Sequence, residues 1–155
     1  MKRKYINIIL FIIVLVTLDQ ISKLLVVNYL NKEIVFIDNF FSFSYVKNYG
    51  AAFGLFGGNT LFLILITMLL IVYLSYDTYK NINKKLNIIF NILIISGALG
   101  NLIDRIFRHY VVDFISFILF NNQMPVFNIA DILVTFGVIG LIFTIFKEER
   151  VWKKY

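Results

Sequence analysis

Four aspartates lie within or beside apolar segments of the chain, namely Asp19, Asp104, Asp113 and Asp131. Ionisable groups are costly in apolar surroundings, so a functional site is the first explanation to consider for them. Two neighbouring carboxylates that share one proton can activate a water molecule and protonate a leaving group. The sequence has no cysteine and a single histidine, which excludes thiol catalysis, thiolate metal sites and zinc sites with several histidines. Acid–base chemistry by carboxylates is therefore the main prediction.

The segment around Asp104 predicts a helix with one polar face. Five residues share this face: Gly97, Gly100, Asn101, Asp104 and Arg108. The glycines would let another helix approach closely, and Asn101 would form a hydrogen bond across that interface. We expect Asp104 to pair with Arg105 or Arg108, and a carboxylate held by arginine stays ionised and shuttles protons poorly.

The other three aspartates have different local partners. Asp19 and Lys23 are four residues apart on a helix, which favours a local ion pair or support of a nearby site. Asn128 and Asp131 have the spacing of a capping box at the start of a helix. Asp113 lies in an apolar run that predicts an interfacial strand or helix. Its side chain either points at water or forms a carboxylate pair, and spacing alone does not decide which acids pair.

The elements that position these residues are predicted to be membrane helices. The chain has 155 residues, of which 60% are apolar and 15% charged, and its mean hydropathy is +0.84. We predict one integral membrane domain over residues 1–155, with four spans at about 5–27, 60–76, 86–103 and 130–146. The first span starts with basic residues but has no small-residue cleavage site after it, so we expect it to be retained rather than removed as a signal peptide.

The basic residues indicate the orientation of these spans. Ten of them lie before the first span, between the second and third, or after the fourth, whereas four lie in the other two connections, about 28–59 and 104–130. This asymmetry predicts that both termini are cytoplasmic. The same asymmetry accounts for the formal net charge of +6, so this charge does not require nucleic acid as a partner.

Helix rise then places the aspartates at one depth. Asp19 lies about 21 Å along the helix from Tyr5, and Asp104 about 27 Å from Leu86, in a hydrocarbon core about 30 Å thick. Asp131 opens the last span and Asp113 lies in the connection before it. All four are therefore expected near the outer membrane surface.

The first outer connection contains a short predicted strand with an aromatic face, because Phe41, Phe43 and Tyr45 alternate with serines. We expect a small sheet on the outer surface, since open sheet edges are not tolerated inside hydrocarbon. Residues 48–56, which are aromatic and glycine-rich, are either a flap or short surface helix over a lipid-borne ligand, or an ordinary interfacial anchor. The predicted fold class is an all-α membrane protein with this small extracytoplasmic sheet and short helix.

Five motifs, in order and spacing, resemble those of the bacterial lipoprotein signal peptidases (signal peptidase II). They are residues 17–23 (TLDQISK), 48–53 (NYGAAF), 97–105 (GALGNLIDR), 111–114 (VVDF) and 127–131 (FNIAD). The resemblance implies an intramembrane aspartyl endopeptidase that cuts prolipoproteins on the N-terminal side of the diacylglyceryl-modified cysteine.

The resemblance also implies roles for individual residues. It makes Asp113 and Asp131 the catalytic pair, and it makes Asp104 a structural residue. The positions implied to bind substrate or support the site are Asp19, Lys23, Asn48, Gly97, Asn101, Arg105, Asn128 and Ala130. The expected partners are lipid-modified prolipoproteins and membrane lipid, and the protein is expected to be a multi-pass monomer of the bacterial cell membrane. No metal or organic cofactor is implied.

Two other functions fit the sequence less well. A Ser–Lys protease would pair Lys23 with Ser22 or Ser96, but Ser22 is its sequence neighbour and Ser96 lies about 12 Å deeper by helix rise. His109 is expected to be a solvated surface residue. A small four-helix transporter or assembly subunit should place its ionisable groups near the membrane midplane, whereas the four aspartates are predicted at one surface.

Overall fold

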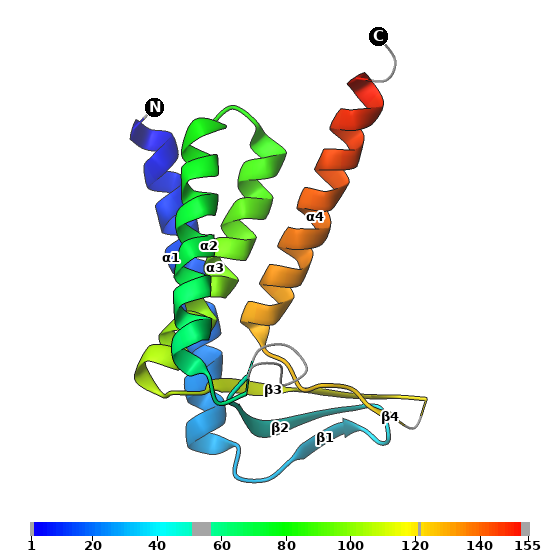
Figure 1. Cartoon of the computed structure of the whole chain (residues 1–155). Helices are drawn as coiled ribbons and strands as arrows, with labels where there is room; N and C mark the ends of the chain where they lie inside the picture. Colours follow the sequence, from blue (N-terminus) through cyan, green and yellow to red (C-terminus); the bar gives the residue numbers. More distant parts are fainter. Residues whose placement is uncertain (1, 51–56, 121, 153–155) are drawn as a thin grey trace.

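The computed structural model describes residues 2–50, 57–120 and 122–152, and contains four long helices and a small antiparallel sheet (Figure 1). The helices are α1 (Lys2–Tyr29), α2 (Thr60–Lys80), α3 (Lys85–Phe107) and α4 (Ile129–Trp152). Each of them is long and apolar enough to cross a membrane. The prediction of four apolar helices with a small sheet is confirmed.

Helix α3 lies at the centre of the bundle and packs against α1, α2 and α4. Its side chains from Ile94 to Ala98 are all buried. By contrast, α2 has large apolar side chains on its outer side, such as Leu69 and Val72, which are 70% and 66% exposed. Such a surface would be unfavourable in water and is typical of a helix that faces lipid.

The sheet consists of β1 (Ile34–Ile37), β2 (Phe41–Asn48), β3 (Val111–Leu119) and β4 (Asn122–Gln123), in that order. Figure 1 shows the sheet at one end of the bundle, and the start of α1 together with the end of α4 at the other. Strand β2 pairs with β3 so that Asn48 lies opposite Val111 and Val46 opposite Asp113. The predicted strand at Phe41, Phe43 and Tyr45 is thus confirmed as part of β2.

The sheet packs against the end of α1 through a small apolar core. Val26 of α1 forms a buried cluster with Val112 and Phe114 of β3, and Phe43 and Tyr45 of β2 pack against this cluster. This packing fixes the start of β3, which contains Asp113. The predicted flap or surface helix falls largely on residues 51–56, which lie outside the described residues.

Candidate active site

Asp113 of β3 and Asp131 of α4 are both bound by Asn128, the residue that precedes α4. The Asn128 side-chain amide donates to Asp113 Oδ1 at 2.6 Å, and the Asn128 backbone N–H donates to Asp131 Oδ2 at 3.1 Å. Asp113 is only 2% exposed, so the interpretation in which its side chain simply points at water is wrong. The fold therefore brings these two carboxylates together around one buried asparagine.

The start of α4 fixes Asp131 through the capping box that the spacing predicts. The Asp131 backbone N–H donates to Asn128 Oδ1 at 2.9 Å, while Asp131 Oδ2 accepts the Asn128 N–H. These reciprocal bonds satisfy backbone donors that the first helical turn would otherwise leave unpaired. They also hold the Asp131 carboxylate close to the helix N-terminus.

Two further amides complete the hydrogen bonds of the carboxylates. Asn48 of β2 donates to Asp113 Oδ2 at 2.9 Å, and Asn101 of α3 donates to Asp131 Oδ1 at 2.8 Å. The side-chain oxygen of Asn101 (Oδ1) in turn accepts a bond from Lys23 at 2.9 Å, which orients the Asn101 NH₂ group toward Asp131. Each of the four carboxylate oxygens thus has a defined donor.

The surroundings of Asp113 favour its protonated form. Burial, and after it repulsion by the Asp131 carboxylate, raise the pKa of Asp113 to about 6. The hydrogen bonds from Asn48 and Asn128 and the positive charge of Lys23 act in the opposite direction. Asp113 is therefore suited to exchange a proton near neutral pH, as a general acid or base must.

A second group of ionised residues lies beside this pair, and we refer to Asp19, Lys23, Asp104 and Arg108 as the buried charge cluster. Lys23 Nζ lies 2.9 Å from Asp19 Oδ2 and 3.2 Å from Asp104 Oδ2, and all three side chains are fully buried. Arg108 pairs with the other oxygen of Asp104. Two positive and two negative charges thus balance, as buried charges must.

The buried charge cluster also holds the backbone next to both carboxylates of the candidate site. Asp104 Oδ2 accepts the N–H of Val112, which precedes Asp113, at 3.0 Å. Asp19 Oδ1 accepts the N–H of Ala130, which precedes Asp131, at 2.9 Å. The predicted ion pair between Asp19 and Lys23 is confirmed, and Asp19 also accepts a bond from the backbone beside Asp131.

The arginine partner of Asp104 is Arg108, and the alternative pairing with Arg105 is wrong. The Arg105 guanidinium turns away and donates to the backbone oxygens of Gly50 at 2.9 Å and Asn101 at 3.4 Å. Arg105 therefore ties Gly50, two residues after β2, to α3.

Gln20 belongs to the same network and was not singled out from the sequence. Its side-chain amide lies 3.1 Å from the Gly100 carbonyl oxygen and 3.3 Å from Asp104 Oδ1, and its own oxygen accepts from Arg108 at 3.4 Å. A side-chain amide inside an apolar helix is costly unless it forms hydrogen bonds. The presence of Gln20 in an apolar segment, directly after Asp19, is therefore the sequence signal that could have indicated its role.

Gly97 and Gly100 allow α3 to approach its neighbours at the level of the site. A Cβ atom at position 97 would lie 2.3 Å from the Ala130 carbonyl oxygen, and one at position 100 would lie 2.5 Å from Asp19 Oδ2. Ala130 itself is fully buried. Small residues at these three positions therefore permit the contacts among α1, α3 and α4.

Gly100→Ala is expected to destabilise the protein by about 1–3 kcal/mol, because the added methyl group must displace the Asp19 carboxylate or the adjacent helices. The measurement is the midpoint of thermal unfolding in detergent. Thr135→Ala, at an exposed position of α4, is the control and should leave the midpoint unchanged. Equal midpoints for wild type and Gly100→Ala would show that the close approach is not required.

The contacts of the two serines do not support a Ser–Lys pair. The Ser22 hydroxyl donates to the Asp19 backbone oxygen at 2.6 Å. The Ser96 hydroxyl is buried and has no hydrogen-bond partner within the described part of the chain. Lys23 is already bound to Asp19, Asp104 and Asn101, and His109 is exposed.

Comparisons with known proteins agree with the motifs. A family model described as signal peptidase (SPase) II matches residues 11–147. The chain is 48% identical over 145 residues to the lipoprotein signal peptidase of Clostridium tetani, covering 91% of this chain and 93% of that protein. It is 46% identical over 148 residues to the lipoprotein signal peptidase of Clostridium novyi, covering 92% and 99%.

A solved structure has a similar fold. It is described as a bacterial membrane enzyme determined by the in meso method at 2.3 Å resolution. It superposes with a TM-score of 0.86 at 32% sequence identity, and the match covers 92% of this chain and 89% of that chain.

Proposed function

Because the chain belongs to the signal peptidase II family, we propose that it removes signal peptides from prolipoproteins by cutting on the N-terminal side of the diacylglyceryl-modified cysteine. The family consists of peptidases of the aspartic type, so the chain is a hydrolase. With four helices able to cross a membrane, it is a multi-pass bacterial membrane protein. Its proposed substrates are lipid-modified prolipoproteins.

Asp113 and Asp131 form the catalytic pair of this proposal. The observation that supports the pair most strongly is that both carboxylates bind the same buried residue, Asn128. In addition, burial and the neighbouring carboxylate raise the pKa of Asp113 to about 6, so one proton can be held by the pair near neutral pH. The substrate-binding and supporting residues of the proposal are Asp19, Lys23, Asn48, Gly97, Asn101, Arg105, Asn128 and Ala130.

The proposed reaction is the addition of water to the scissile peptide bond. Ionised Asp131 accepts a proton from a water molecule, whose oxygen attacks the carbonyl carbon. Protonated Asp113 donates its proton to the carbonyl oxygen, which gives a neutral tetrahedral diol. When the C–N bond breaks, Asp131 returns its proton to the leaving amine, and Asp113 recovers a proton from the collapsing diol. The two carboxyl groups then hold one proton again.

The proposed orientation places both termini in the cytoplasm and the sheet at the outer membrane surface. Its support is the excess of basic residues, ten against four, in the segments on the side of the termini. A substrate anchored by a signal peptide and two acyl chains would present its scissile bond at that surface. The candidate site and the scissile bond would then lie at the same depth in the membrane.

A cleavage assay with purified protein tests this function. A diacylated prolipoprotein should be shortened, which a gel shift detects, whereas the same prolipoprotein without its lipid should remain intact. A transporter or assembly subunit would give no shortened product in either case.

Asn48→Ala is expected to move the alkaline limb of the pH profile of kcat/KM to higher pH. In the free enzyme the protonated form of Asp113 is the active one, so kcat/KM should fall as pH rises through its pKa of about 6. The Asn48 hydrogen bond lowers that pKa, and its removal should therefore raise it. Asn31→Ala, at an exposed position, is the control and should leave the limb in place. A limb that stays fixed or moves to lower pH in Asn48→Ala would contradict the assignment.

A further inference from the structure

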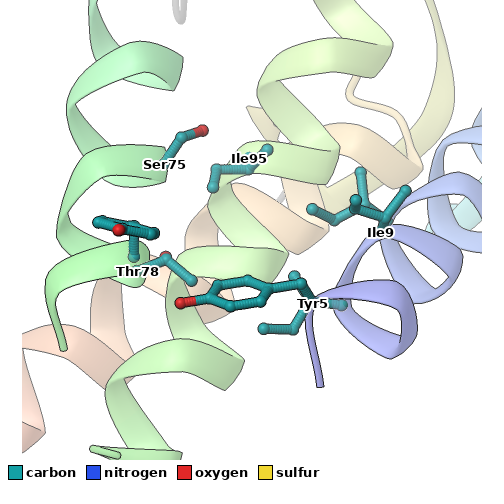
Figure 2. Close-up of a pocket in the computed structure, with 8 residues that line it drawn as sticks. Tyr5, Ile9, Ser75, Thr78 and Ile95 are labelled. Atoms are coloured by element: carbon teal, nitrogen blue, oxygen red, sulfur yellow. The ribbon is translucent and has the colours of Figure 1, made fainter. Parts of the chain in front are cut away.

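A pocket lies between α1, α2 and α3, in the half of the bundle that contains the start of α1 (Figure 2). Its volume is about 200 Å³, and it is separate from the candidate active site. Eight residues line it: Tyr5, Ile8, Ile9, Ile12, Ser75, Thr78, Tyr79 and Ile95. Ile9 and Tyr79 are 56% and 68% exposed, so the pocket opens on the outer surface of the helices, where lipid surrounds a membrane protein.

The lining changes from polar to apolar along the helices. The rings of Tyr5 and Tyr79 stack at 6.0 Å between centroids near the bundle end. The side chains deeper in the bundle, toward Ile12 and Ile95, are apolar. From Tyr5 to Ile12, α1 rises about 10 Å. This order matches that of a phospholipid, whose polar part lies at the surface and whose acyl chains lie below it.

Two hydroxyl groups lie between these polar and apolar parts. Thr78 is 6% exposed, and its oxygen accepts a bond from the Asn91 side chain at 3.1 Å. Ser75, one turn deeper on α2, is exposed and also lines the pocket. Figure 2 shows both side chains beside the pocket, where they can donate to ester oxygens.

Basic residues lie at the same end of the bundle as Tyr5 and Tyr79. Lys4 and Lys80 directly adjoin the two tyrosines in sequence, and Lys4 donates to the backbone oxygen of Ile82, which brings it to the turn between α2 and α3. Four more basic residues lie in the same two segments: Lys2, Arg3, Lys84 and Lys85. Asp77, two residues before Tyr79, accepts bonds from the side-chain amides of Asn81 and Asn91 at 2.8 Å each.

We propose that this pocket binds a phospholipid with a negatively charged headgroup. One acyl chain lies against the isoleucines, ester oxygens accept hydrogen bonds from Ser75 and Thr78, and the phosphate lies beside Lys4 and Lys80. The apolar lining favours an acyl chain, and the nearby lysines favour an anionic headgroup over a zwitterionic one. The lipid would join α1 to α2 on the side of the bundle away from the sheet.

Native mass spectrometry of the full chain in mild detergent tests the proposal, with phosphatidylglycerol and phosphatidylcholine as probes. Wild type should bind phosphatidylglycerol at least about tenfold more tightly than phosphatidylcholine, since each basic group near the headgroup increases the affinity for an anionic lipid roughly fivefold. Lys4→Gln combined with Lys80→Gln should remove most of this preference. Ser75→Leu combined with Ile9→Trp, which fills the pocket, should weaken the binding of both lipids.

Lys147→Gln is the matched control, because it removes one exposed positive charge from α4 near the same end of the bundle without touching the pocket. Unchanged cleavage activity in all variants would show that each still folds, since none of these residues belongs to the candidate active site. Equal retention of the two lipids by wild type would overturn the proposal. So would full retention of phosphatidylglycerol by the filled-pocket variant, or a loss in Lys4→Gln/Lys80→Gln no greater than that in Lys147→Gln.

Discussion

Asp113→Asn is expected to lower kcat for prolipoprotein cleavage by at least about 10³-fold while leaving the protein folded. An asparagine can still accept a hydrogen bond from Asn128 and fits the same buried space. It cannot, however, supply a proton to the carbonyl oxygen or recover one from the diol. The measurement is the rate of product formation from a diacylated prolipoprotein, together with the midpoint of thermal unfolding.

Asp131→Asn is expected to give the same loss, because the amide retains an oxygen for the capping box but cannot accept a proton from water. Asp38→Asn, at an exposed position in the turn between β1 and β2, is the matched control and should keep full activity. If Asp113→Asn or Asp131→Asn cleaved at the wild-type rate, that residue would not belong to the catalytic pair.

Lys23→Met is expected to destabilise the protein by roughly 3–5 kcal/mol, which is the usual cost of removing one partner from a buried ion pair. Methionine fills a similar volume but leaves the fully buried Asp19 without the positive charge that pairs with it, whereas Asp104 still pairs with Arg108. The thermal midpoint in detergent should fall accordingly, and activity should fall with it because both aspartates hold the backbone beside the candidate pair.

A second substitution distinguishes charge balance from loss of packing. Adding Asp19→Asn to Lys23→Met leaves Asp104 paired with Arg108 as the charged residues of the buried charge cluster, so the two changes together should cost less than the sum of their separate effects. Lys32→Met, on an exposed residue after α1, should have no effect on the midpoint. A Lys23→Met midpoint equal to that of wild type would contradict the structural role of the cluster.

Much of the candidate site follows from local sequence patterns. Helix rise predicts that Asp19 and Asp104 lie at one level, and Lys23 indeed binds both. The spacing of Asn128 and Asp131 predicts a capping box, and both of its hydrogen bonds are present. These features depend on residues within a few turns of one helix, or on depth along a helix, so the sequence is sufficient to predict them.

Contacts between distant segments could not be predicted in this way. The bond from Asn48 to Asp113 depends on the register of β2 against β3, and these strands are separated in sequence by two membrane helices. Similarly, the bond from Arg105 to the Gly50 backbone oxygen joins α3 to a residue 55 positions earlier in the chain. Long-range packing rather than local propensity determines both contacts.

The arrangement also gives a physical account of how a small membrane protein holds two carboxylates in place. The residue before each of them, Val112 and Ala130, donates its backbone N–H to an aspartate of the buried charge cluster. Asn128 then joins the two carboxylates directly. Backbone contacts and the bonds from Asn128 thus together fix the positions of the two carboxylates.

The most direct test of the proposed function is the mass of the products formed from a synthetic diacylated prolipoprotein peptide. Purified wild type should give two fragments, a free signal peptide and a product whose first residue is the diacylglyceryl-modified cysteine. Neither fragment should form with Asp113→Asn or Asp131→Asn under the same conditions. A cut at any other bond, or the same two fragments at the wild-type rate from either variant, would contradict the proposal that these two aspartates catalyse cleavage before the lipid-modified cysteine.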